Sequence, residues 1–240
     1  MTELTVIVLA YNEVHSLQAT IEQLNSSLSG RDVKIIISTS SHATYECRKM
    51  AEDLLTKFKN VSMHIQVKPY VASAVMEVAH QSNTKYIVYM SSDLETPPEL
   101  VATMLEKATV TGVDIVIASR WIQNSRFENY GKWKYFLSYS AQKLCKLIYP
   151  NGLTEFTYGF RLYKKEVLCG YRYFETKHPF FLESLLVQLK FNMKICEIPV
   201  NWKARNEGKS LVKKMTLLRY LVPIFRTKLL PKRFYKLLEP

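Results

Sequence analysis

Residues 1–120 alternate between short apolar runs, rich in Val and Ile, and longer segments whose apolar residues recur every three or four positions. The short runs predict buried β-strands, and the longer segments predict amphipathic helices. Strands that alternate with helices are typical of an α/β fold, a mostly parallel sheet covered by helices on both faces. Such a sheet binds ligands at the carboxyl ends of its strands. The predicted strands span residues 4–10, 33–37, 61–67, 86–90 and 113–118, and the predicted helices span 14–28, 43–58, 72–81 and 97–108.

The second half of the chain continues without a linker rich in Pro, Gly or Ser. We therefore expect one domain, residues 1–210, followed by a C-terminal extension, residues 211–240. Pro199 falls inside a strand-like run, which predicts an edge or bulged strand. The elements predicted in this half are an amphipathic helix over 133–148, a helix over 180–189, and strands over 158–163 and 195–202.

The net charge of +12 is concentrated at the C-terminal end of the chain. From Lys203 to Pro240 there are eleven Lys or Arg and two Glu, a net charge of +9, so the rest is nearly neutral. Leu, Tyr, Phe and Ile are mixed with these cations, and Pro223 and Pro231 divide the segment into short helices. This combination predicts helices that lie at the surface of an anionic membrane. The alternative is a basic tail that packs against its own domain.

Two other classes of anion-binding protein fit the sequence less well. A nucleic-acid-binding module needs a basic face interleaved with aromatic side chains. Here the cations occupy an apolar tail divided by prolines, so we expect no nucleic-acid partner. The seven glycines form neither a P-loop nor a dinucleotide-binding motif.

The cysteines and the N-terminal residues bear on cellular location. The four cysteines form no CxxC pair, which predicts buried thiols in a reducing compartment. The first residues lack the pattern of a signal peptide, and no run of about 18 apolar residues predicts a membrane-spanning helix. We therefore expect a cytoplasmic protein that is peripheral on the membrane.

Two carboxylates, Asp93 and Glu95, directly follow the predicted strand 86–90, in a loop that ends at Pro97-Pro98. A magnesium ion is typically held by one or two carboxylates together with substrate phosphates, so this pair is a candidate metal site. The alternative is a solvated turn in which Glu95 caps the following helix. The spacing alone does not decide between these interpretations.

Five short motifs occur in order along the chain, between residue 6 and about residue 212. They are Leu9-Ala10-Tyr11-Asn12-Glu13; Ser91 to Glu95 with Pro97-Pro98; Ser119-Arg120-Trp121; Gly159 to Leu168, which contains Phe160-Arg161-Leu162-Tyr163; and Glu197-Ile198-Pro199-Val200 with Arg205, Gly208 and Ser210. Together they resemble the motifs of family 2 glycosyltransferases, in particular the polyprenyl-phosphate glycosyltransferases typified by dolichyl-phosphate mannosyltransferase.

This resemblance implies a GT-A fold, a nucleoside-diphosphate sugar as donor, and Mg²⁺ or Mn²⁺ as cofactor. It implies inverting transfer of the sugar to a polyprenyl phosphate at the membrane surface. A metal ion and guanidinium groups would stabilise the charge that builds on the diphosphate leaving group. A membrane protein or a second copy of the chain is a candidate partner.

The resemblance also implies roles for single residues. The expected catalytic residues are Asp93, Arg120, Glu183 and Arg205, and the expected metal ligands are Asp93 and Glu95. The expected nucleotide-sugar contacts are Ala10, Tyr11, Asn12, Glu13, Ser38, Lys68, Ser92, Asp93 and Arg120. The expected acceptor or phosphate contacts are Lys134, Arg161, Arg205, Lys209 and Ser210.

Glu183 occupies the family's acidic position on the helix after the Phe-Arg motif. If the acceptor is a hydroxyl, on a growing glycan or a lipid-linked sugar, such a carboxylate is the natural general base. A polyprenyl phosphate is already an anion and needs no base, so Glu183 would then position other groups. A salt-bridged structural carboxylate is the third interpretation. Glu155 stands where relatives carry an acid before the Phe-Arg motif, and it is either functional or structural.

Several positions depart from the family pattern. Relatives usually carry an acid after the second strand, where it meets the nucleotide base, whereas this chain has Ser38-Thr39-Ser40-Ser41. Ser91 replaces the first acid of the metal turn, residues 68–73 contain no glycine, and Leu211 replaces a lysine, with Lys209 in front of it. An inactive partner subunit is therefore an alternative. Because the other acids and arginines of the motifs remain, we favour an active, divergent enzyme.

Overall fold

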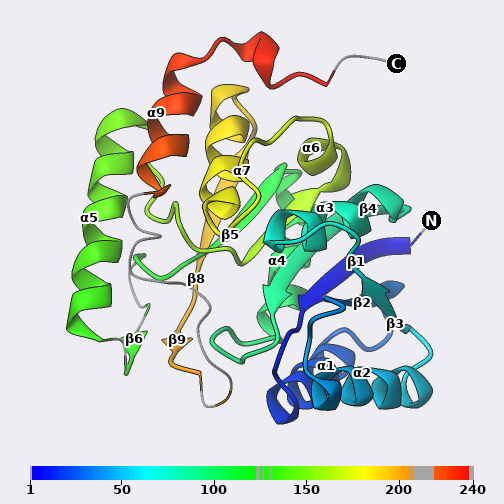
Figure 1. The fold of residues 1–240 in the computed structure, drawn as a ribbon. Helices are drawn as coiled ribbons and strands as arrows, with labels where there is room; N and C mark the ends of the chain where they lie inside the picture. Colours follow the sequence, from blue (N-terminus) through cyan, green and yellow to red (C-terminus); the bar gives the residue numbers. More distant parts are fainter. Residues whose placement is uncertain are drawn as a thin grey trace.

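The computed structural model describes residues 2–122, 125, 127–129, 131–205, 207 and 219–237. Its centre is a seven-stranded sheet in the order β3-β2-β1-β4-β7-β5-β8 (Figure 1). Neighbouring strands are parallel except at β7, which runs antiparallel to both β4 and β5. The strands are β1 (Thr2–Leu9), β2 (Val33–Thr39), β3 (Val61–Ile65), β4 (Thr84–Ser91), β5 (Ile115–Ser119), β7 (Arg161–Lys164) and β8 (Ile195–Pro199).

Helices cover both faces of this sheet, as the alternation in the sequence predicts. In β1, Val6 and Val8 belong to the core on one face and Ile7 to the core on the other, so the strand is an almost continuous apolar run. The helices on the first face are α1 (His15–Ser27), α2 (Tyr45–Lys57) and α4 (Leu100–Thr111). Those on the second are α3 (Val71–Gln81), α5 (Lys132–Ile148), α6 (Lys165–Cys169), α7 (Pro179–Lys190) and α9 (Leu221–Leu229).

The register of strand pairing brings three strand ends to one edge of the sheet. Leu9 at the end of β1 is level with Ser38 of β2 on one side and with Ser91 of β4 on the other. The turns that follow β1 and β4 carry the polar motifs of the sequence. Residues about 80 positions apart along the chain therefore meet at the carboxyl edge, where sheets of this class bind ligands.

A second sheet, made of two short parallel strands, extends this edge. β6 (Phe127–Glu128) pairs with β9 (Trp202–Lys203), and Figure 1 shows the two side by side. The Lys203 amide also donates to the Glu95 carbonyl at 3.3 Å, which fixes β9 to the turn after β4. The small sheet therefore delivers the segment after β9, which includes Arg205, to the carboxyl edge of the main sheet.

The structure confirms the α/β fold class and the edge position of the strand that ends at Pro199, since β8 is the outermost strand beside β5. The helix predicted from residue 97 begins at Leu100. The carbonyls of Pro97 and Pro98 accept the amides of Leu100 and Val101 in a preceding turn. All four cysteines are free thiols, two of them buried and two half-buried.

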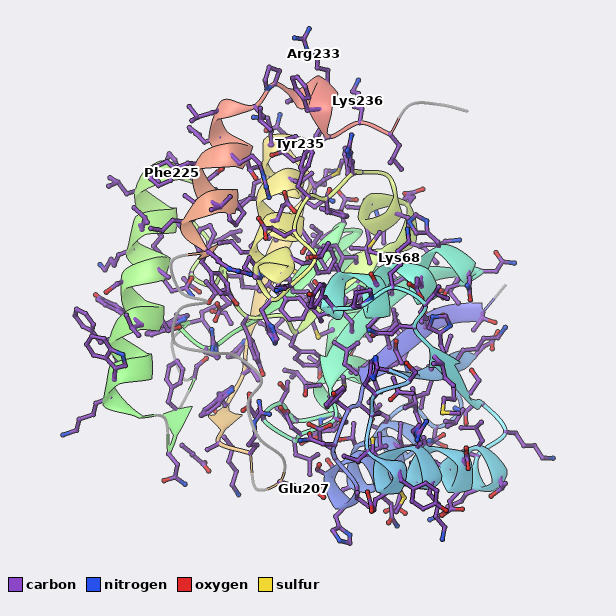
Figure 2. The ribbon with its side chains drawn as sticks, viewed as in Figure 1. Lys68, Glu207, Phe225, Arg233, Tyr235 and Lys236 are labelled. Atoms are coloured by element: carbon purple, nitrogen blue, oxygen red, sulfur yellow. The ribbon has the colours of Figure 1, made fainter. Side chains whose placement is uncertain are left out.

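The described part of the C-terminal extension packs on the rest of the chain. α9 lies against α7 with Pro223, Ile224 and Thr227 buried, and the 3-10 helix η1 (Lys232–Phe234) leads to the fully buried Tyr235 (Figure 2). None of the described helices is long and apolar enough to cross a bilayer. Residues 208–218 lie outside the described part, so the division of the chain at residue 210 stays a prediction.

Candidate active site

The turn after β4 holds Asp93 in a buried position at the carboxyl edge of the sheet. The Asp93 residue is 2% exposed, and its Oδ1 accepts the Glu95 amide at 3.1 Å. Leu94 lies between them with a φ of 57°, in the left-handed region. Ser92 anchors the turn to β1, because its amide and hydroxyl both donate to the Leu9 carbonyl, at 3.1 and 2.9 Å. The turn is therefore fixed to the sheet, unlike a solvated loop.

Arg205 contacts both predicted metal ligands. Its Nη2 pairs with Asp93 Oδ2 at 2.9 Å, and its Nε pairs with Glu95 Oε1 at 2.8 Å. The planar guanidinium thus takes one oxygen from each of two carboxylates, which suits its forked set of donors. Glu95 and Arg205 are 110 positions apart in the sequence. We refer to these three residues as the edge cluster.

The edge cluster fits a divalent cation. The pKa of Asp93 is raised to about 6, first by burial and then by the charge of Glu95, while Arg205 opposes the rise. A buried carboxylate of this kind is stabilised by an added cation, and carboxylate oxygens are ligands that Mg²⁺ prefers. Among the described residues, no group of three or more His, Cys, Asp or Glu side chains could hold a metal ion. A cation at Asp93 and Glu95 would therefore take its other ligands from substrate phosphates or water.

The turn after β1 is shaped by Glu13, which is almost completely buried. Its Oε2 accepts the amides of Tyr11 and Asn12, at 2.9 and 3.0 Å. The Ala10 amide donates to the Ser38 carbonyl at 3.1 Å, which holds the start of the turn against β2. The Glu13 carboxylate therefore holds the backbone of residues 10–13, the turn that is predicted to contact the nucleotide.

Glu207, two residues after Arg205, caps the N-terminus of α1. Its carboxylate accepts the amides of Val14, His15 and Ser16 at 3.1, 3.3 and 2.7 Å, and Figure 2 shows it beside the start of that helix. The unpaired amides and the helix dipole favour an anion at this position. The segment after β9 is thus held at two points of the carboxyl edge, by Arg205 and by Glu207.

The predicted nucleotide contacts Ser38 and Lys68 differ in their surroundings. Ser38 is buried, and its hydroxyl donates to the Ala74 carbonyl at 2.7 Å. The structure therefore corrects our expectation for the Ser38 hydroxyl, which joins β2 to α3 instead of facing a ligand. Lys68 is exposed (Figure 2), and its amide donates to Glu77 Oε1 at 3.0 Å, so its backbone is fixed while its side chain reaches solvent.

Arg120 is buried in a bidentate pair with Glu155. Its Nε and Nη2 donate to Oε2 and Oε1 at 2.8 and 3.1 Å, and its Cζ lies 4.4 Å from the centroid of the Tyr158 ring. Burial favours a higher pKa for Glu155, but Arg120 and backbone amides hold that pKa below its ordinary value. Glu155 is thus a structural partner of Arg120, and direct contact of Arg120 with the donor stays a prediction.

Arg161 is completely buried. Its Nη2 donates to the Phe156 carbonyl at 2.6 Å, and its Nη1 donates to the Phe181 carbonyl. These bonds tie the loop that follows Glu155 to the first turn of α7. A guanidinium with no exposed surface does not reach an acceptor phosphate in this conformation. The structure therefore corrects the expected acceptor contact of Arg161 to a positioning role.

Glu183, the predicted base, is completely buried beside α9. Its Oε2 accepts the amides of Phe174 and Glu175, at 2.8 and 2.7 Å, and its Oε1 pairs with Arg226 Nη2 at 2.9 Å. The same Arg226 nitrogen pairs with Glu175 Oε1 at 2.7 Å. Burial raises the pKa of Glu183 in spite of these partners. Both carboxylate oxygens are engaged, which matches the structural interpretation of this residue and not a base that faces an acceptor.

Two residues that the sequence analysis does not single out belong to this region. The Tyr158 hydroxyl is bonded to Thr96, in the turn after β4, while its ring packs on Arg120. Burial lowers the pKa of His178, at the start of α7, and the nearby charge of Arg205 lowers it further. Spacing along the chain connects neither residue to the turn after β4, because each comes near it only when the chain folds.

Three predicted contacts are left without a structural description. Lys209 and Ser210 lie outside the described residues, and the side chain of Lys134, near the start of α5, is also outside the description. Their expected contacts with an acceptor phosphate stay predictions.

Residues 5–170 match the sequence model of a family described as Glycosyl transferase family 2. The chain is 26% identical to the dolichol-phosphate mannosyltransferase of Pyrococcus furiosus over 228 residues, which cover 93% of this chain and 63% of that protein. It is 26% identical to the polyprenol monophosphomannose synthase of Mycolicibacterium smegmatis over 127 residues, 52% of this chain and 42% of that protein. The matched part is thus less than two thirds of the length of each of these relatives.

Among solved structures, the chain is similar to glucosyl-3-phosphoglycerate synthase from Mycobacterium tuberculosis, in complex with Mn²⁺, uridine diphosphate and phosphoglyceric acid. The TM-score is 0.72, and the match covers 96% of this chain and 80% of that one. The sequence identity is 15%, so the likeness concerns the fold, and it confirms the expected GT-A architecture.

Proposed function

Because the chain belongs to glycosyl transferase family 2, we propose that it transfers a sugar from a nucleoside diphosphate to a polyprenyl phosphate, with inversion at the sugar carbon. The observation that carries this proposal is the edge cluster, which gathers two carboxylates and an arginine at the carboxyl end of β4. The names of the two relatives, a dolichol-phosphate mannosyltransferase and a polyprenol monophosphomannose synthase, support this class of acceptor.

In this proposal, Asp93 and Glu95 would hold Mg²⁺ or Mn²⁺ beside the diphosphate of the donor. The structurally similar synthase was crystallised with Mn²⁺ and uridine diphosphate, which supports the choice of metal. When bound there, a divalent cation would supply electrostatic stabilisation for the negative charge that develops on the leaving diphosphate. Arg205 exchanges a carboxylate oxygen for a phosphate oxygen, because its planar group of donors matches both partners.

The surroundings of Glu183 favour a phosphate acceptor over a hydroxyl. A hydroxyl must lose its proton to a base within hydrogen-bond reach as the new bond forms. Both oxygens of the predicted base are instead engaged with two backbone amides and Arg226. An acceptor phosphate oxygen is already anionic, so it can bond to the sugar carbon as the bond from that carbon to the donor diphosphate breaks. No proton transfer is then required.

We propose that α5 and α9 form the surface that meets the membrane. Trp133, Phe136 and Leu147 lie along one side of α5 and are 64%, 58% and 80% exposed, and Leu229 of α9 is 78% exposed. Figure 1 shows the two helices next to each other, and Phe225 of α9, labelled in Figure 2, is 48% exposed. Apolar and aromatic side chains flanked by cations are typical of helices at a bilayer surface. Exposed cations that the structure describes on these two helices include Lys132, Lys143, Lys146 and Lys228, and Lys232 follows in η1.

The activity is tested by incubating the purified protein with a panel of nucleotide sugars and a short polyprenyl phosphate, and by measuring release of nucleoside diphosphate. We expect release with at least one donor, and only when both the acceptor and Mg²⁺ or Mn²⁺ are present. Absence of release with every donor would contradict the proposal.

The class of acceptor is tested with Glu183→Gln, which keeps the size of the side chain. If the acceptor is a phosphate, the folded variant should retain transfer. If the acceptor is a hydroxyl of a lipid-linked sugar, transfer should nearly disappear, because the base is lost. A thermal unfolding curve must accompany the assay, since Glu183 also holds two backbone amides.

The membrane surface is tested by sedimentation with vesicles that contain anionic or only neutral lipids. We expect binding to anionic vesicles that falls as salt is added. Trp133→Ser and Phe136→Ser together should weaken this binding and leave the folded state intact, because both residues are exposed. Equal binding by the variant would contradict the assignment of α5 to this surface.

A further inference from the structure

Tyr70, the last residue of the connection between β3 and α3, has a backbone conformation that is rare for a residue with a side chain. Its φ is 79° and its ψ is 166°. Glycine occupies this region readily, whereas other residues occupy it only under strain, and such strain is concentrated at functional sites. A tyrosine in this conformation therefore implies that its side chain does something that glycine would not.

The strain is not needed to build the connection. Glu77 accepts the amides of Val67 and Lys68 at 2.8 and 3.0 Å, which fixes the chain before Tyr70. After it, the Ala72 amide donates to the Thr176 carbonyl at 3.0 Å. All of these bonds use the backbone or Glu77, so a glycine at position 70 would keep them without strain. The Tyr70 ring must therefore contribute something other than the shape of the loop.

The ring also contributes little to the hydrophobic core, since Tyr70 is 48% exposed. Its described ring contact is with a cation, because Lys177 Nζ lies 4.5 Å from the ring centroid. The loop that carries Lys177 is fixed as well, by Glu183 at Phe174 and Glu175 and by the Thr176 carbonyl. The structure thus presents an exposed aromatic ring and an ammonium group on two rigid loops.

This pair lies on the side of the sheet where the donor is proposed to bind. Tyr70 follows β3, next to β2, at the carboxyl end of the parallel strands. Lys177 directly precedes His178, which lies close enough to Arg205 for that charge to lower the pKa of the imidazole. The pair therefore lies on the same side of the sheet as the strand ends that carry the edge cluster and the turn at residues 10–13.

The end of β2 offers no acidic side chain to a nucleobase. The strand ends in Ser38 and Thr39, both are buried, and the Ser38 hydroxyl donates to the Ala74 carbonyl. A nucleobase over the end of β2 thus finds no carboxylate there. An aromatic ring can hold any nucleobase by stacking, because every base has a π-face.

We infer that Tyr70 and Lys177 bind the donor, with the Tyr70 ring stacked on the nucleobase and the Lys177 ammonium paired with the diphosphate. This inference rests on the proposed function and adds to it the way in which the nucleotide is held. It implies weak discrimination among bases, since stacking depends little on their hydrogen-bonding groups.

The test is calorimetric titration of the intact protein with GDP and with UDP in the presence of Mg²⁺. For Tyr70→Gly we expect an unchanged or higher unfolding temperature, because the strain is relieved, and about tenfold weaker binding of the diphosphates. Tyr70→Phe, which keeps both the ring and the strain, should bind within about twofold of the unchanged protein. Lys177→Ala should weaken binding and reduce its dependence on salt.

The outcomes separate this inference from the proposed function. If the unchanged protein binds no nucleoside diphosphate, both are overturned. If it binds and Tyr70→Gly binds equally well, only the role of Tyr70 is overturned. A marked fall in the unfolding temperature of Tyr70→Gly would also overturn it, since the ring would then be needed for stability.

Discussion

Arg205 and Arg226 each bridge two carboxylates, but the two bridges are built into the molecule in different ways. Arg226 belongs to α9, and its partner Glu183 on α7 is completely buried and also accepts two backbone amides. Arg205 lies at the carboxyl edge of the sheet, where its partner Asp93 accepts one backbone amide. The first bridge holds a loop and the C-terminal helix in place, whereas the second joins side chains around a turn that is also anchored by Ser92.

This difference indicates which ion pair can be exchanged for a ligand. Breaking the Arg226 bridge would leave a buried carboxylate unpaired and loosen the contact between two helices. Breaking the Arg205 bridge leaves the backbone of the turn in place, because Ser92 still bonds to Leu9. In the proposed function, a cation can therefore take the place of the guanidinium beside Asp93 and Glu95, while Arg205 turns to a phosphate oxygen of the donor. An arginine between two carboxylates is thus structural beside α7 and α9, and replaceable at the edge cluster.

The largest effect is expected for Asp93→Asn, which removes the negative charge of Asp93 and keeps the size and shape of the side chain. Transfer should fall by about 10² to 10³, the usual cost of losing a group that stabilises a developing charge. The unfolding temperature should not fall, since burial disfavours the charged form of Asp93. The check is sugar transfer beside a thermal unfolding curve. Transfer at the normal rate would show that the edge cluster is not the metal site.

Arg226→Leu and Arg205→Leu compare the two bridges directly. Arg226→Leu should lower the free energy of unfolding by about 3 kcal/mol, because Glu183 is left as a buried, unpaired charge. Arg205→Leu should lower it by about 1 kcal/mol, since Arg205 is one quarter exposed and the turn has other anchors. Denaturant unfolding measures both. Equal losses of stability would contradict the distinction between a structural and a replaceable bridge.

The pH dependence should report on Asp93, whose pKa is raised to about 6 from its ordinary value of 3.8. A cation competes with the proton on this carboxyl group, so at low metal concentration transfer should fall about tenfold per pH unit below pH 6. Between about pH 4 and 6 the folded protein binds more protons here than the unfolded chain, so stability should decrease as pH rises. Asp93→Asn should lose the dependence on pH below 6 in both transfer and stability. An unchanged dependence of stability on pH would contradict the raised pKa of Asp93.

The smallest effect is expected for Arg205→Lys, which keeps the positive charge but loses the forked set of donors. An ammonium group cannot pair with Asp93 and Glu95 in the same planar way, so donor binding should weaken about fivefold. Steady-state kinetics with varied donor concentration measure this change. If the substitution has no effect, charge alone accounts for the role of Arg205.

Much of the fold follows from local patterns in the sequence. The period of apolar residues separates strands from helices, and their alternation predicts the layered α/β sheet, because each strand must be covered on both faces. The order of β7 and β5 in the sheet does not follow from this period, since pairing depends on contacts between residues far apart. The bend before α4 is local, and Pro97 and Pro98 mark it.

Within the candidate site, sequence patterns alone can identify residues that meet through their neighbours along the chain. Asp93 and Glu95 are brought together by one turn, so their spacing after a predicted strand marks them as a candidate pair. The motifs on either side of the turn favour a metal site over a solvated turn. The tertiary structure alone decided which of the other residues share that site. It brings Arg205 to the turn, uses Glu207 to cap α1, and buries Glu183.

The physical reason is that the strength of an ion pair or hydrogen bond depends on distance and burial, and neither is encoded in spacing along the chain. Arg161 is part of a clear sequence motif, yet its guanidinium is completely buried and bonded to two carbonyls. Tyr70 belongs to no motif, yet its strained backbone and exposed ring distinguish it once the chain is folded. Residue type indicates which chemistry is available, and the fold decides where that chemistry meets solvent.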